Sequence, residues 1–112
     1  MKVLEVKDAD ITPNPHGVDA RKIYDTEHAQ AVVITLKPGE RLKRHITPVD
    51  VFFYVLEGRG VVEIGDEKQE VGADTLIESP ADIPHCWYNE SDGILRVLVV
   101  KAPRPAKPTR LL

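Results

Sequence analysis

Short runs of apolar and β-branched residues, each ended within a few positions by glycine or proline, are the feature that most constrains this chain. The run 31–36 (Ala-Val-Val-Ile-Thr-Leu) stops at Pro38 and Gly39, and the run 51–56 stops before Gly58. Such runs are typical of strands, and the seven glycines and nine prolines leave no stretch of ten or more residues with helical periodicity. Many short strands at this spacing predict an all-β sandwich or barrel.

The remaining runs give the same reading. Residues 61–64 and 69–71 flank Gly65 and Asp66, a pattern that predicts a β-hairpin with Gly65 at a positive φ. Further strands are expected at 75–78, 84–88 and 94–100.

The length of 112 residues predicts one domain, 1–112, with a core at about 28–101. Residues 1–27 are predicted to form an N-terminal arm and loop, with one strand near 21–24. Residues 102–112 contain three prolines and are predicted to run as an extended tail.

Composition excludes several classes of protein. Hydrophobic residues make up 42% and the net charge is −3, which argues against a disordered chain and against nucleic-acid or membrane partners. Cys86 is the only cysteine, so neither an intrachain disulfide nor a cysteine-rich zinc site is expected. The charged start, without an apolar segment like that of a signal peptide, predicts a cytoplasmic protein.

Two histidine-bearing stretches resemble the two sequence motifs of the cupins. Gly39, His45 and Gly58 stand at positions of the first motif. The residues that match the second motif are Gly72, Pro80, His85 and Asn89, with Asp82 at the glycine position of its Pro-x-Gly. The match spans about residues 31–100. It implies a small single-domain cupin of the RmlC-like superfamily, that is, a jelly-roll β-barrel or double-stranded β-helix.

The same resemblance implies a metal site, from which this chain departs. Typical cupins hold a divalent metal with two histidines and a glutamate of the first motif and a histidine of the second. Here Thr47 stands at the second histidine position, and Val51 or Phe52 at the glutamate position. Only His45 and His85 remain as strong ligands.

Two imidazoles leave most coordination positions of a divalent ion (Zn, Ni, Fe or Mn) to other donors. Asp50 and Thr47 are the nearest oxygen donors, and the upstream His16 and His28 could fold over the barrel mouth. Two readings stay open: the histidine pair binds metal, or the site has lost its metal and keeps the histidines as polar groups of a pocket.

The pocket walls are predicted from the alternation of side chains along strands. With His45 and His85 pointing inward, Thr47 and Trp87 should do so too, while Cys86 points away. Placing Phe52 at the glutamate position also brings in Tyr54. The alternative for these aromatic residues is ordinary core packing.

The sequence therefore predicts a small cupin whose pocket binds or acts on a small molecule, with or without metal. An isomerase or lyase with His45 or His85 as general base, a non-catalytic binding or sensing module, and a purely structural protein are the competing functions. A homodimer is expected, because the run 51–56 is apolar on both faces and its outer face needs cover.

Overall fold

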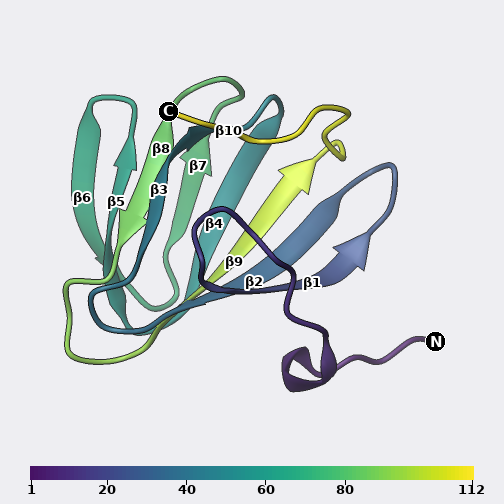
Figure 1. Ribbon diagram of the computed structural model, residues 1–112, viewed down its shortest axis with the longest axis horizontal. Coiled ribbons are helices and arrows are strands. Elements are labelled where there is room, and N and C mark those ends of the chain that lie inside the picture. Colours follow the sequence, from purple (N-terminus) through teal and green to yellow (C-terminus); the bar gives the residue numbers. More distant parts are fainter.

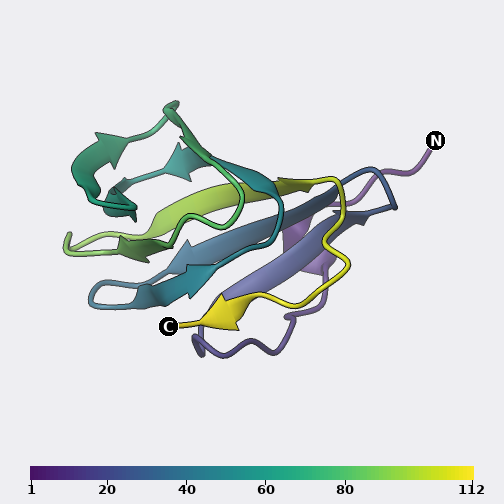
Figure 2. The ribbon, with the colours of Figure 1, turned by 90° about the horizontal axis from the view of Figure 1, so that it is seen from above.

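The computed structural model describes all of residues 1–112 as two antiparallel sheets packed face to face (Figures 1 and 2). The first sheet has the order β1-β2-β9-β4-β7 and the second the order β10-β3-β8-β5-β6. The strands of the first sheet are β1 (Asp19–Asp25), β2 (Gln30–Leu36), β4 (Asp50–Glu57), β7 (Leu76–Ser79) and β9 (Leu95–Ala102). Those of the second sheet are β3 (Arg41–Ile46), β5 (Arg59–Ile64), β6 (Glu67–Gly72), β8 (His85–Tyr88) and β10 (Arg110–Leu111).

The predicted all-β fold is confirmed. The only helical element is one 3-10 turn, Val6–Asp8, near the N-terminus. No helical segment has the length and apolar character that a membrane span requires.

Glycine and aspartate turns join the strands where the sequence analysis expects them. β5 and β6 form a hairpin whose two-residue loop is Gly65-Asp66, with Gly65 at φ +59°. Asp82, at the glycine position of the second motif, has φ +64°, a left-handed conformation that glycine adopts without strain. The glycine position of the second motif is therefore a turn at which the backbone adopts a left-handed conformation.

The hydrophobic core fills the space between the two sheets. On β9 the buried side chains are Leu95, Val97 and Val99, which alternate along the strand. The core cluster consists of Val18, Leu36, Leu42, Val51, Phe53, Val55, Val62, Val71, Trp87, Leu95, Val97 and Val99. Five of these residues, Val18, Leu42, Val51, Phe53 and Val99, also line a cavity between the sheets.

Both chain ends contribute strands to the sheets. The strand predicted near 21–24 lies within β1, which forms an edge strand beside β2. The C-terminal segment does not end as a free tail, because Arg110 and Leu111 pair with Ile46 and His45 of β3. The prolines interrupt the ladder only up to position 108, and the residues after them again offer N–H groups for pairing.

Candidate functional site

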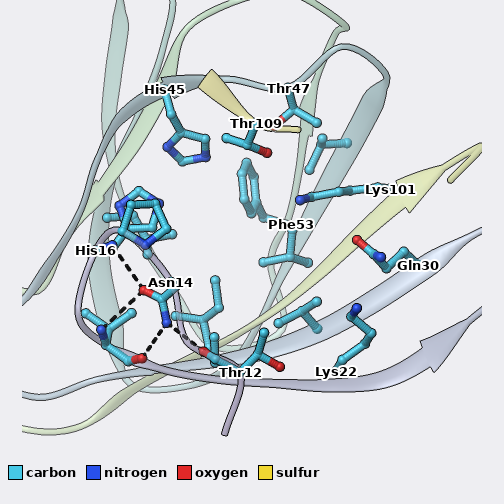
Figure 3. Close-up of a pocket in the computed structure, with 18 of the residues that line it drawn as sticks. Thr12, Asn14, His16, Lys22, Gln30, His45, Thr47, Phe53, Lys101 and Thr109 are labelled. Carbon is cyan, nitrogen blue, oxygen red and sulfur yellow. Dashed lines mark hydrogen bonds between the residues drawn. The ribbon is translucent and has the colours of Figure 1, made fainter. Parts of the chain in front are cut away.

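A cavity of about 240 Å³ lies between the sheets at the open end of the sandwich (Figure 3). Its apolar wall comes from both sheets, through Val18, Ala20, Val32, Ile34, Leu42, Val51, Phe53 and Val99. Its polar lining consists of Thr12, Asn14, His16, Lys22, Gln30, His45, Thr47, His85, Lys101 and Thr109. The lining holds two lysines and no carboxylate, although the chain as a whole carries a net charge of −3.

His45 and His85 are brought together by direct pairing of β3 and β8 within one sheet. The two residues are cross-strand partners, and their Nε2 atoms lie 2.9 Å apart. Leu42 and His45 are three positions apart, so in a regular strand their side chains would point to opposite faces. A bulge between them shifts the register, and both side chains point into the sandwich. The rings of His45 and His85 meet edge to face, with centroids 4.3 Å apart.

A chain of hydrogen bonds defines the proton positions on these two rings. His45 Nδ1 lies 2.6 Å from the carbonyl oxygen of Lys43, which can only accept, so this nitrogen carries the proton. In neutral His45 the Nε2 atom is therefore the acceptor, and His85 Nε2–H donates to it. His85 Nδ1 then accepts from the buried hydroxyl of Ser79 at 2.7 Å. Every ring nitrogen of the pair has a partner within the protein.

His16 joins this pair from the N-terminal loop. Its ring centroid lies 4.9 Å from that of His45, and its Nδ1 accepts a hydrogen bond of 2.8 Å from the backbone N–H of Lys43. His28, by contrast, lies exposed in the turn between β1 and β2, beside Glu27. Of the two upstream histidines, only His16 reaches the cavity.

Burial keeps the three cavity histidines neutral. Desolvation, followed by the charge of His45, lowers the pKa of His85 to about 3. Desolvation is also the main reason that the pKa of His16 falls to about 4 and that the pKa of His45 is lowered. The site therefore presents neutral imidazoles at pH 7.

Two predicted pocket residues, Phe52 and Tyr54, point the other way. The buried positions of β4 are Val51, Phe53 and Val55. Val51 therefore stands at the inward position where typical cupins have the glutamate. The ring of Phe53 packs against that of His85, with centroids 5.2 Å apart. The Tyr54 hydroxyl donates to Asp74 outside the sandwich. The prediction failed because this strand is apolar on both faces and offers no contrast by which to choose the inner one.

Trp87 points inward, as predicted, but it belongs to the core below the cavity. Its side chain is fully buried and packs edge to face on Phe53 at 5.5 Å. Cys86 points to the opposite face, as expected, with its Sγ 3.5 Å from the Tyr88 hydroxyl. Asn89 does not line the cavity: its amide donates to the carbonyl oxygens of Gly93, in its own turn, and of Leu36, at the end of β2.

The further donors considered for a metal fall into two kinds. Asp50 lies away from the histidines, where its carboxylate accepts the backbone N–H of Ala81 at 2.9 Å. Thr47 does line the cavity, with its hydroxyl 3.4 Å from His85 Nε2. No group of three or more histidine, cysteine or acidic side chains is arranged to hold a metal ion. The residues present thus supply part of a coordination shell and do not complete it.

Two residues that contribute to the site were missed by the sequence analysis, one on β9 and one at the end of β7. On β9 the side chains of Leu95, Val97 and Val99 point inward, and Lys101 is the next residue in this alternation. Its side chain therefore lines the cavity. Ser79, next to Pro80 of the second motif, is buried against His85. The inward position of Lys101 could have been read from the sequence, whereas the contact of Ser79 with His85 depends on how the two sheets pack against each other.

Comparisons with known proteins agree with this architecture. A family model described as the cupin domain matches residues 32–101. Among curated proteins, the chain is 30% identical over 115 residues to polyketide synthase CurC of Streptomyces cyaneus, covering 96% of this chain and 73% of that protein.

Two solved structures are also similar. TT1209 from Thermus thermophilus is 31% identical, with a TM-score of 0.80 over 94% of this chain and 100% of that one. The polyketide cyclase RemF from Streptomyces resistomycificus has a TM-score of 0.85 over 100% of this chain and 85% of its own, at 24% identity. The likeness to RemF shows a shared fold.

Proposed function

The chain belongs to the cupin family, and we propose that it binds a small, partly apolar organic molecule in the cavity beside His45 and His85. The observation that carries this proposal is the cavity itself: an apolar wall from both sheets, with convergent polar groups at one end. Its 240 Å³ is less than the roughly 300–1,000 Å³ of sites for drug-sized ligands, which favours a molecule of one or two rings. The similarity to CurC, which is named as a polyketide synthase, supports a polyketide-like ligand.

The histidine pair favours binding over general-base catalysis. A general base works best with a pKa near the working pH, and burial lowers the pKa of His85 to about 3. Such an imidazole is a weak base and stays uncharged, so the pair lines the cavity as a neutral polar group. Because the histidine pair also supplies only part of a coordination shell, the leading hypothesis is a metal-free binding cupin.

A second candidate function is metal binding with the ligand completing the coordination. It is favoured by one feature of the pair: both Nδ1 atoms are held, by Lys43 and Ser79, and the two Nε2 atoms lie 2.9 Å apart, where a metal ion would replace the hydrogen bond between them. Histidine ligands of metals are commonly held in this way through their second nitrogen. Elemental analysis of the purified protein would show one metal per chain for this candidate and none for the leading one.

The cavity proposal is tested by filling the cavity. Val32 lines it, and Val32→Phe adds a ring to the space, whereas Val61→Phe makes the same change on a strand outside the cavity lining. We expect 2-naphthol to bind the parent protein and Val61→Phe alike in isothermal calorimetry, and Val32→Phe at least tenfold more weakly. Equal binding by all three would place the probe elsewhere and contradict the proposal.

We also propose that two copies pair through the outer face of β4 and β9. A shallow depression on this face includes Phe52, Val100, Ala102 and Pro80, and nearby Leu56 and Leu76 are exposed. Light scattering at micromolar concentration should give the mass of two chains, and Phe52→Glu should give the mass of one. A single-chain mass for the parent contradicts the homodimer.

A further inference from the structure

Lys101 brings a cation into the cavity without any anion beside it. The residue lies at the end of β9, on the same face as Val99, and its side chain projects from that strand into the cavity (Figure 3). Its cross-strand partners, Gln30 and Val51, also line the cavity. The position is therefore built into the inner face of the sheet.

The ammonium of Lys101 takes part in none of the chain's ion pairs. Lys22, the other lysine of the lining, pairs with Asp25 at 3.5 Å. No aspartate or glutamate lines the cavity, so nothing within it neutralises Lys101.

A partly desolvated cation without a counter-ion is unfavourable, and the protein compensates by weakening its protonation. Burial, followed by the charge of Lys22, lowers the pKa of Lys101. An anion placed against the ammonium would remove this cost and gain a charge-assisted hydrogen bond. The cavity is thus electrostatically prepared for a negative group at the β9 end and for apolar contacts along Val99 and Phe53.

We propose that Lys101 is the receptor for a carboxylate, so that the ligand of this cavity is a small organic monocarboxylate with an apolar body. This rests on the proposed function, because it assigns the class of molecule that the cavity takes. The carboxylate binds Lys101, the apolar body fills the space between the sheets, and the neutral histidines contact its far end.

The test compares two probes of nearly the same shape, 2-naphthoate and 2-naphthamide, by isothermal calorimetry at pH 7.5. We expect the parent protein to bind the carboxylate at least tenfold more tightly than the amide. Lys101→Met removes the charge and should reduce this preference to less than twofold, mainly by weakening the carboxylate. Lys37→Met makes the same change at an exposed turn and should keep the preference of the parent.

The outcomes separate the two proposals. If both probes bind the parent equally, or if Lys101→Met keeps the preference, the carboxylate receptor is wrong while the cavity proposal stands. If neither probe binds the parent, the cavity proposal fails and the receptor fails with it. Should Lys101→Met not fold, Lys101→Gln tests the loss of the charge in the same way. In the parent protein, the 13Cε resonance of Lys101 should shift when 2-naphthoate is added, and an unshifted resonance contradicts the carboxylate receptor.

Discussion

At the scale of single residues, Thr47 decides how many strong donors the cavity offers. It follows β3, faces the cavity, and places its hydroxyl 3.4 Å from His85 Nε2. A hydroxyl is a poor ligand for divalent transition metals, whereas an imidazole is a good one. The identity of this one side chain therefore decides whether a third imidazole can join the hydrogen-bonded pair of His45 and His85 from the same segment as His45.

Replacing Thr47 with histidine should create a stronger metal site. We expect Thr47→His to bind Zn²⁺ at least tenfold more tightly than the parent in calorimetry, because a third imidazole joins His45 and His85. Adding His45→Ala to this variant should return the affinity to that of the parent. A Thr47→His protein that folds and gains no affinity would show that the three positions do not converge on one ion.

At the scale of elements, Gly58 allows β4 to turn into β5 against the start of β9. It has φ +85°, and a Cβ at this position would collide with the backbone carbonyl of Ile94. Gly39 has the same φ of +85° and open space around it. Both glycines of the first motif therefore need a left-handed backbone conformation, but only at Gly58 is there no room for a side chain.

This difference predicts unequal costs for the same substitution. Gly39→Ala should lower the free energy of unfolding by about 1–2 kcal/mol, the cost of a left-handed conformation. Gly58→Ala should lower it by at least about 3 kcal/mol, because the backbone must also shift away from Ile94. Urea denaturation of both variants measures the difference, and equal costs would contradict the steric explanation.

Asn89 joins three elements through its buried amide. Its Nδ2 donates to the carbonyl oxygens of Leu36, at the end of β2, and of Gly93, before β9, both at 2.8 Å. Its Oδ1 accepts from the backbone N–H of Ser91 at 3.1 Å. The asparagine of the second motif is thus a structural tie.

Removing this tie should destabilise the protein without changing the cavity. Asn89→Ala leaves two carbonyl oxygens without their donor, and we expect the free energy of unfolding to fall by about 2–4 kcal/mol. Ser91→Ala, which removes a hydroxyl of the same turn, should cost less than about 1 kcal/mol. Both are measured by urea denaturation, and an Asn89→Ala protein as stable as the parent would refute the role.

At the scale of the whole molecule, the neutral histidines couple folding to pH. The pKa of His85 falls from 6.5 to about 3 on folding, so below pH 6.5 the unfolded chain binds a proton that the folded chain does not. Acid therefore favours unfolding, and the contribution of His85 is complete above about pH 6.5 and is lost as the pH falls toward 3. His45 and His16 act in the same direction.

We expect the free energy of unfolding to fall between pH 7.5 and pH 5. His85 contributes at most about 1.4 kcal/mol per pH unit to this slope. His85→Gln should have a smaller slope than the parent, whereas His28→Gln, a change at an exposed turn, should keep it. Urea denaturation at the two pH values measures the slopes, and a parent protein equally stable at both would contradict the coupling.

The sequence alone determined the all-β class, the hairpin at Gly65-Asp66 and the strand that carries His85. These follow from short-range properties: where glycine and proline interrupt a strand, and which residues alternate along it. The same alternation would have placed Lys101 on the inner face of β9, although the sequence analysis did not use it. Local chemistry was sufficient wherever one strand could be read without knowing its neighbours.

Only the tertiary structure decided which face of β4 is the inner one and how the two histidines meet. Val51 and Phe53, rather than Phe52 and Tyr54, face the cavity, because a strand apolar on both sides carries no polar contrast. The 2.9 Å contact of the histidines depends on a bulge in β3, and the closing strand β10 depends on pairing between segments far apart in the chain. Register and closure are set by contacts between distant strands, which periodicity along one strand does not encode.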